Sequence, residues 1–145
     1  MRHLIQFTAT RPGVLPPVYS TPGSAACDFF YTGGKDIVLR PGEWTMVGTG
    51  LKMCIPHGYC LDLLPRSGLG AKKGIVLRNT VGLIDSDYRE EIFACLHNTG
   101  DEVFTLKQGE RFVQGRFLAV SQATFVHADS LPSTERTGGF GSTGA

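Results

Sequence analysis

The chain has 145 residues, of which 19 are Gly and 8 are Pro. Backbone breakers at this density exclude a coiled coil or a helix bundle, because inside a helix a Gly costs about 1 kcal/mol and a Pro about 3 kcal/mol. Fourteen Lys and Arg against thirteen Asp and Glu give a net charge of +1, which disfavours nucleic acid as a partner, and no apolar stretch approaches the ~20 residues of a membrane span.

Short apolar runs alternate with turn residues along most of the chain. Many of the runs are β-branched or aromatic, and Pro-Gly or Gly-Gly pairs separate them. Strands with turns at a spacing of about 8–12 residues predict an all-β, antiparallel sandwich or barrel. The expected strands are residues 4–7, 37–39, 51–55, 59–64, 75–77, 92–96, 103–106, 117–120 and 124–126.

Helix is expected at one place only, as one or two turns after Ser67, around residues 69–73. The last 18 residues contain almost no core-forming side chains, so we expect a core domain over residues 1–127 and a flexible, Gly-rich C-terminal arm over residues 128–145. A plain Gly/Ser tail has no use for Arg136 and Phe140 on either side of a Gly pair. This combination predicts a segment that becomes ordered on a ligand.

The four cysteines are typical of an intracellular protein. Cys27, Cys54, Cys60 and Cys95 form no C-x-x-C pair, and each has apolar neighbours. We therefore expect buried, reduced thiols. Residues 1–6 become polar too soon for a signal-peptide core, so a cytoplasmic location is expected.

Residues 65–74 place Arg66, Ser67 and Gly68 at the mouth of the short helix. A hydroxyl, a cation and free backbone amides at a helix start favour anion binding. Ordinary capping of the helix by Ser67 explains the same residues equally well.

Residues 79–92 contain the apolar pair Leu83 and Ile84, which is followed directly by Asp85. The sequence Asp-Ser-Asp then favours a turn, so the segment predicts a hairpin with a carboxylate at its edge. The backbone of such a hairpin could pair with a planar base, and Tyr88 could pack on a sugar. The alternative is a turn in which the Asp side chains bond their own backbone.

Signatures of several other enzyme classes are absent. The sequence has no Walker loop, no dinucleotide-binding Gly pattern opening a long helix, no H-E-x-x-H and no G-x-S-x-G. It also lacks the His-x-Glu and paired cysteines of a zinc-dependent nucleobase deaminase.

Taken in order, the unusual segments closely resemble the motifs of the trimeric deoxyuridine triphosphatases (dUTPases). The resemblance spans residues 25–144. The matching segments are residues 25–29 (Ala-Ala-Cys-Asp-Phe), 65–70 (Pro-Arg-Ser-Gly-Leu-Gly), 82–88 (Gly-Leu-Ile-Asp-Ser-Asp-Tyr), 109–114 (Gly-Glu-Arg-Phe-Val-Gln) and 139–144 (Gly-Phe-Gly-Ser-Thr-Gly).

The resemblance implies a jelly-roll fold and a homotrimer whose active sites lie between subunits, with the arm of one chain closing over a site built by the others. It implies Mg²⁺-assisted hydrolysis of dUTP to dUMP and pyrophosphate, which keeps uracil out of DNA and supplies dUMP for dTMP synthesis. Asp85 would be the general base that activates a water for attack on the α-phosphorus. Asp28 would contact Mg²⁺ through water.

The resemblance also assigns the substrate contacts. The phosphates would be bound by Arg66, Ser67, Gly68, Gln114, Arg136, Ser142 and Thr143. Uracil and deoxyribose would be bound by Asn79, Gly82, Leu83, Tyr88 and Phe140. The sequence departs from the family pattern at Glu90, where the family has Gly, and at Gly115-Arg116, where the family is apolar. Between Arg136 and Phe140 it is one residue shorter than the family.

Two other functions share this fold. One is a dCTP deaminase-type relative, which would need a different acid–base arrangement at the hairpin. The other is a regulatory protein-binding module, which a degenerate set of motifs would support. The hairpin sequence and the full Gly-rich tail favour the dUTPase.

Overall fold

The computed structural model describes residues 3–135 and residue 138 of the chain. This part consists of antiparallel strands and one short helix, which confirms the predicted all-β class. The elements are β1 (Gln6–Ala9), β2 (Cys27–Phe30), β3 (Ile37–Leu39), β4 (Trp44–Gly48), β5 (Leu51–Cys54), β6 (Tyr59–Pro65), α1 (Ser67–Lys73), β7 (Ile75–Leu77), β8 (Gly82–Ile84), β9 (Phe93–Asn98), β10 (Phe104–Leu106) and β11 (Arg111–Ala119).

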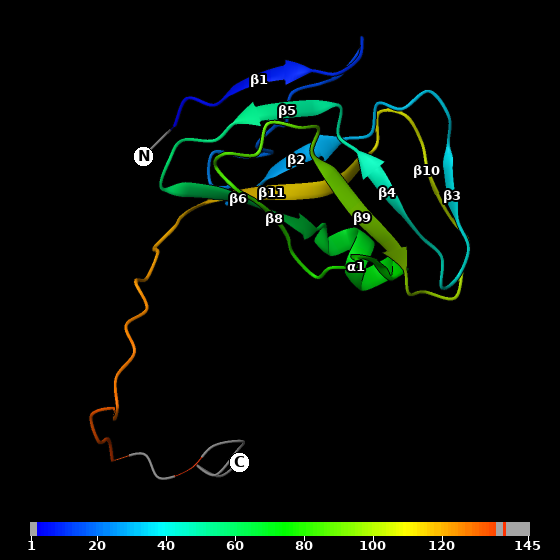
Figure 1. The fold of residues 1–145 in the computed structure, drawn as a ribbon. Helices are drawn as coiled ribbons and strands as arrows, with labels where there is room; N and C mark the ends of the chain where they lie inside the picture. The colour runs from blue at the N-terminus through cyan, green and yellow to red at the C-terminus, as the bar shows by residue number, and fades with distance from the viewer. Residues whose placement is uncertain (1–2, 136–137, 139–145) are drawn as a thin grey trace.

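Strands that are far apart in sequence lie side by side in the sheets (Figure 1). A four-stranded sheet has the order β2-β11-β6-β8, and a three-stranded sheet has the order β4-β9-β7. Two further pairs are β1 with β5 and β3 with β10. All of these ladders are antiparallel, and the crossovers between them bring distant motifs onto one sheet.

The four-stranded sheet has one apolar face and one polar face. In β6, Leu61 and Leu63 are completely buried in the core. Side chains alternate between the two faces of a strand, so Asp62 points to the other face. The register opposes Arg116 to Asp62 and Gln114 to Asp28, and this polar face is therefore where the predicted phosphate residues meet.

Three features of the strands differ from the sequence-based expectations. Residues 124–126 form no strand, because Phe125 and Val126 pair with no strand among the described residues and are largely exposed. Strands β2, β4 and β8 were not among the expected strands. Residues 117–119 form the end of a much longer strand, β11, and residue 120 follows it. After β11 the described chain runs away from the body of the molecule (Figure 1).

All four cysteines lie in the described part of the chain and are free thiols. Cys27 and Cys60 are buried as expected, but Cys54 is exposed, because it lies on the solvent side of β5, where its neighbours Met53 and Ile55 point inward. Among the described residues, no helix is long and apolar enough to cross a bilayer.

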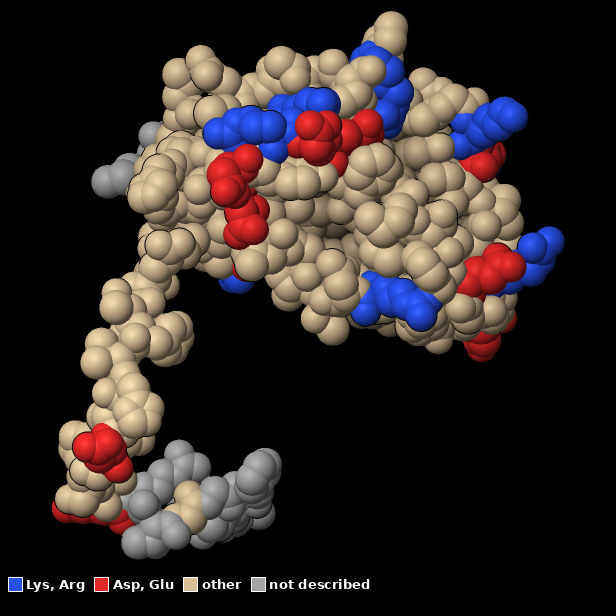
Figure 2. Space-filling view, in the orientation of Figure 1, with Lys and Arg blue, Asp and Glu red and all other residues tan. Residues whose placement is uncertain are grey.

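Acidic and basic side chains are mixed on the face seen in Figure 2, where they lie next to one another along its upper edge. This pattern agrees with the small net charge of the whole chain. On the described part of this face, charges of both signs are interspersed and no broad patch of one sign is present to attract a charged ligand.

Candidate active site

Three sequence-predicted residues lie together at one end of the four-stranded sheet. Asp28 on β2 stands directly opposite Gln114 on β11, and Arg66 directly follows β6. All three line a pocket of about 410 Å³, which we call the phosphate pocket. Its other lining residues are Ser20, Ser24, Ala25, Ala26, Leu64, Ser67 and Arg116.

Asp28 holds two arginines at this pocket. Its Oδ1 accepts a hydrogen bond from Arg66 Nε at 2.8 Å, and its Oδ2 accepts one from Arg111 Nη1 at 3.0 Å. Ser20 Oγ donates to the same Oδ2 at 3.2 Å. The side chain of Asp28 is only 11% exposed, so the two guanidiniums offset the cost of burying its charge.

Gln114 and Ser67 complete this group of residues. Gln114 Nε2 donates to the carbonyl of Pro65 at 2.8 Å, which fixes the amide beside the start of α1. Arg66 occupies the N-cap position, and no side chain caps the helix. Ordinary capping by Ser67 is therefore not observed; Ser67 lies exposed at the pocket, and Gly68, the next residue, is also exposed.

Asp85 and Tyr88 form a second group at the other edge of the same sheet. Asp85 directly follows β8, and the backbone N–H of Tyr88 donates to the carbonyl of Asp85 at 3.2 Å, which closes the expected turn. The phenol of Tyr88 donates to the carbonyl of Glu91 at 2.9 Å. Within the described residues, neither the Asp85 nor the Asp87 carboxylate accepts a hydrogen bond from its own turn, so the Asp85 carboxylate is free to meet a ligand.

The turn before β8 is strained. Thr80 has φ of 61°, the only non-glycine residue in the left-handed region in the described part of the chain. Backbone N–H of Val81 donates to the carbonyl of Asn79 at 2.7 Å, so the chain reverses tightly around Thr80. Such strain persists only where surrounding structure enforces it and is common at binding sites. It fixes Asn79 and the start of β8.

The expected hairpin is not a two-stranded ladder. Strand β8 pairs with β6, whereas β7 and β9 pair with each other in a different sheet. The turn of residues 85–88 therefore connects two sheets. Gly82 and Leu83 lie on β8, with Gly82 buried against Leu63 and Leu83 exposed on the polar face.

The two groups do not meet within one chain. Three strand spacings of about 4.8 Å separate β2 from β8, and the register displaces Asp85 by four residues, roughly 13 Å, from the row of Asp28. The two carboxylates are therefore roughly 20 Å apart. A single chain presents a phosphate pocket at one edge and a free carboxylate at the other.

The Cys60 thiol lies on the polar face next to Asp62. Burial raises the pKa of the Cys60 thiol, and the charges of Asp62 and Asp85 raise it further. Cys60 Sγ lies 3.9 Å from Asp62 Oδ1. The thiol therefore stays protonated, and it is unsuited to act as a nucleophile here.

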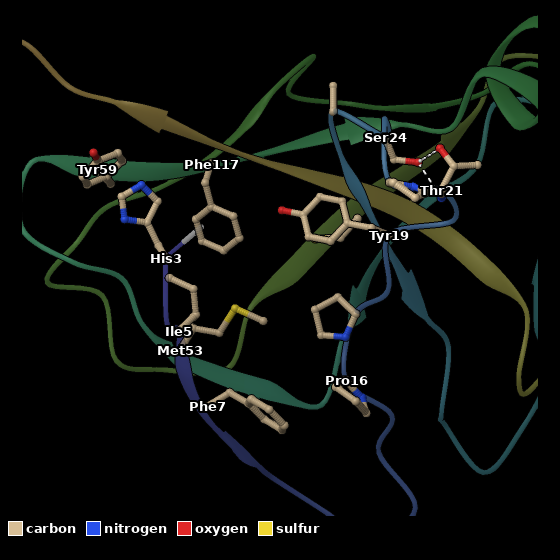
Figure 3. Close-up of a pocket in the computed structure, with 14 residues that line it drawn as sticks. His3, Ile5, Phe7, Pro16, Tyr19, Thr21, Ser24, Met53, Tyr59 and Phe117 are labelled. Atoms are coloured by element: carbon tan, nitrogen blue, oxygen red, sulfur yellow. Dashed lines mark hydrogen bonds between the residues drawn. The ribbon is translucent and has the colours of Figure 1, made fainter. Parts of the chain in front are cut away.

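A larger hollow of about 860 Å³ adjoins the phosphate pocket, with which it shares Ser24 and Ala25, but none of the predicted site residues lines it. Tyr19 and Phe117 face each other across it, and His3 stacks on Tyr59 with 4.4 Å between ring centroids (Figure 3). Burial raises the pKa of Tyr19 and of the neighbouring Cys27 thiol. The lining is mainly apolar, and among the described residues no Lys or Arg contributes to it.

The described residues build no metal cage. They contain no cluster of three or more His, Cys, Asp or Glu side chains that could hold an ion. Asp28 is the only carboxylate at the phosphate pocket, and both of its oxygens accept hydrogen bonds from arginines. This donor set fits Mg²⁺ bound mainly by water and by substrate oxygens, because Mg²⁺ dehydrates reluctantly.

Comparisons with known proteins agree with this geometry. The dUTPase family model matches residues 15–144. The chain belongs to the dUTPase family. Deoxyuridine 5'-triphosphate nucleotidohydrolase from Tolumonas auensis is 48% identical over 130 residues, which are 88% of this chain and 86% of that protein. The protein of the same name from Neisseria gonorrhoeae is 47% identical over 131 residues, with 89% and 87% covered.

Solved dUTPase structures have the same fold. The dUTPase of Staphylococcus bacteriophage 80alpha with dUPNHPP has a TM-score of 0.89 at 21% identity, covering 99% of this chain and 100% of that one. A dUTPase from phage phi11 of S. aureus, in which coordination of a structural Mg(II) ion is described, has a TM-score of 0.80 at 18% identity, with 88% and 98% covered.

Two departures from the dUTPase pattern have a structural explanation. Glu90, which stands where the family has Gly, does not adopt the left-handed backbone that would strain it, and its carboxylate pairs with Lys52 Nζ at 2.8 Å. Gly115 lies in the middle of β11, where an added Cβ would come within 2.6 Å of Phe29 and 2.8 Å of Leu61. The core therefore has no room for a side chain there.

Sequence reasoning did not assign a role to Arg111 or Arg116. Arg111 shares Asp28 with Arg66, and Arg116 lines the phosphate pocket. A signal was available for Arg116, because a charged residue two positions after Gln114 lies on the same face of a strand. The predicted residues Arg136, Phe140, Ser142 and Thr143 lie outside the described residues.

Proposed function

We propose that this chain hydrolyses dUTP to dUMP and pyrophosphate, the reaction that gives its 47–48% identical relatives the name deoxyuridine 5'-triphosphate nucleotidohydrolase. The observation that carries the proposal is the phosphate pocket, where motif residues from three distant segments, Asp28, Arg66 and Gln114, come together on one sheet. In the cell this reaction would keep uracil out of DNA and supply dUMP for dTMP synthesis.

The phosphate chain would bind in this pocket. Arg66 presents its guanidinium from a fixed position because Asp28 holds its Nε, and a planar fork of donors suits phosphate oxygens. Ser67, Gly68 and Gln114 would add neutral donors. From the arm, Arg136, Ser142 and Thr143 would contact the terminal phosphate. When bound, Mg²⁺ would offset the negative charge that develops on the pyrophosphate leaving group, with Asp28 reaching it through water.

Asp85 would act as the general base. Its carboxylate would accept a proton from the water that attacks the α-phosphorus, because the water must lose that proton as the new P–O bond forms. The free position of Asp85 at the end of β8 supports this role, since no residue of its own turn occupies the oxygens.

The strained turn and β8 would select the base and the sugar. Asn79 and the backbone of Gly82 and Leu83 offer donors and acceptors to the uracil edge, and cytosine would leave some of them unpaired. Tyr88, tied to the carbonyl of Glu91, would lie against deoxyribose and exclude a 2′-hydroxyl. Phe140 would stack on uracil.

The separation within one chain supports a homotrimer. Asp85 lies roughly 20 Å from Asp28, too far for both to serve one phosphate chain. A second copy could bring its Asp85 edge to the phosphate pocket, and the arm of a third could close the site. Cyclic assemblies of identical chains allow such shared sites.

Replacing Asp85 with Asn tests the proposed reaction. The wild-type protein with dUTP and Mg²⁺ should release pyrophosphate, and D85N should lose about 10²–10⁴-fold in kcat. D87N is the matched control, because Asp87 is an exposed carboxylate of the same turn with no proposed role. Thermal unfolding checks that both variants fold.

Consumption of dCTP in place of dUTP would reject the proposed substrate. If D85N hydrolysed dUTP at the wild-type rate, Asp85 would not be the base, although dUTP would still be the substrate.

A further inference from the structure

Arg116 brings a second cation into the phosphate pocket from a position where the family is apolar. It lies two residues after Gln114 on β11, so its side chain leaves the same face about 6.8 Å further along the strand. It lines the pocket together with Arg66 and Ser67, and 44% of its side chain is exposed. Its charged end is therefore accessible to a ligand.

Asp62 on the neighbouring strand β6 forms an ion pair with this arginine. Arg116 Nη2 lies 3.4 Å from Asp62 Oδ2, directly across the β6–β11 ladder. The carboxylate of Asp62 is only 12% exposed, and its other contact is with the Cys60 thiol. The pocket thus repeats one arrangement twice: a nearly buried Asp holds an Arg that faces the pocket, Asp28 with Arg66 and Asp62 with Arg116.

The contact with Asp62 uses little of the binding capacity of Arg116. A guanidinium carries five N–H donors in a planar fork, and a single contact at 3.4 Å is at the long end of hydrogen-bond geometry. The remaining donors are available to an anion. An ion pair needed only for stability gains little here, because apolar side chains of similar size stabilise a half-buried position equally well.

We propose that Arg116 binds the oxygens of the substrate's phosphate chain, as a second cation beside Arg66, and that Asp62 is the positioning residue that orients it. This inference rests on the proposed function of the pocket and deepens it. The ligand chemistry is a linear polyphosphate ester. Arg116 would contribute to binding and not to proton transfer.

The test separates binding of anions from stability of the fold. R116M removes the charge and keeps the length of the stem, but it leaves Asp62 without its cation. D62N/R116M removes both charges and should recover the midpoint of thermal unfolding. R40M is the matched control, because Arg40 is an exposed arginine paired with Glu43 on another part of the surface.

We expect R116M and D62N/R116M to bind sodium tripolyphosphate about tenfold more weakly than wild type in calorimetry, the usual scale for one charge-assisted hydrogen bond. The KM for dUTP should rise by a similar factor with kcat nearly unchanged. R40M should match wild type in both. Wild-type affinity in D62N/R116M would overturn the proposal, because Arg116 would then serve only to neutralise Asp62.

The two proposals fail differently. If wild type binds tripolyphosphate in an Arg116-dependent way but does not hydrolyse dUTP, the proposed reaction is wrong and the anion site stands. If wild type hydrolyses dUTP and R116M retains both KM and tripolyphosphate affinity, the reaction stands and the role of Arg116 is wrong.

Discussion

At the residue scale, the Glu91 side chain forms hydrogen bonds with two segments that are far from it in sequence, residues 10–11 and Gly50. Its Oε1 accepts hydrogen bonds from Arg11 Nη1 at 2.9 Å and from the backbone N–H of Gly50 at 2.8 Å, and its Oε2 accepts one from Thr10 Oγ1 at 2.9 Å. Burial by itself would raise the pKa of Glu91, but these hydrogen bonds outweigh it and lower the pKa below its ordinary value.

E91Q should therefore destabilise the protein by about 1–2 kcal/mol at pH 7, since hydrogen bonds to a charged group are lost. A group whose pKa is lowered on folding stabilises the fold above its unfolded pKa, and this contribution disappears as pH falls through the folded pKa. Urea unfolding from pH 7 to pH 3 measures the free energy of unfolding of both proteins. The difference between wild type and E91Q should become smaller below about pH 4.5. A gap that stays constant over this range would contradict the assignment.

The residues of the phosphate pocket show what the sequence could predict about the site. Asp28, Arg66 and Gln114 were assigned from their motifs, and the structure brings them together. Their partners were not foreseen, because the pairing of Asp28 with Arg111 depends on the register of β2 against β11. Residue types indicate chemistry, whereas register decides which side chains meet.

At the element scale, short buried strands were the easiest to predict. Residues 37–39 and 75–77 are β-branched apolar runs between turn residues, and they match β3 and β7 residue for residue. Strand β4 was missed because Trp44 and Met46 are exposed and only Val47 is buried, so its hydrophobic pattern is weak. The strand predicted for residues 124–126 does not form, since no described part of the chain covers Phe125 and Val126.

Strand β11 illustrates how a core excludes a side chain. G115A should lower stability by about 1–3 kcal/mol, because the new methyl group would overlap the buried rings and methyls of Phe29 and Leu61. Urea unfolding measures the effect. G34A is the control, because Gly34 has open space around its Cα and needs no left-handed backbone, so it should be neutral or slightly stabilising. Equal stability of the two variants would show that the core around β11 yields easily.

At the scale of the whole molecule, the proposal gives the body and the arm of residues 128–145 separate tasks. Residues 120–135 are exposed throughout, and the proposed contacts of Phe140, Ser142 and Thr143 lie beyond them. The division at residue 127 remains a prediction. A stop codon after residue 135 should leave the melting temperature unchanged, because no core residue is removed.

The same truncation should reduce kcat/KM for dUTP about tenfold or more, since base–aromatic stacking alone contributes about 1–3 kcal/mol. Steady-state kinetics with dUTP measures the loss. A truncated protein with full activity would remove the arm from the catalytic assembly, whereas a lower melting temperature would give the arm a structural role.

Arg66 follows β6 and Asp85 follows β8, and because these neighbouring strands are antiparallel the two residues lie at opposite ends of the strand pair. In the proposed shared site, this makes the defects of two variants complementary. D85N retains an intact phosphate pocket, and R66M retains an intact base, so each variant should be inactive by itself. If the two are unfolded together and refolded at equal amounts, about a quarter of the shared sites should pair a sound pocket with a sound base. The mixture of two inactive variants would then recover activity towards dUTP. A site built within one chain could not recover activity in this way.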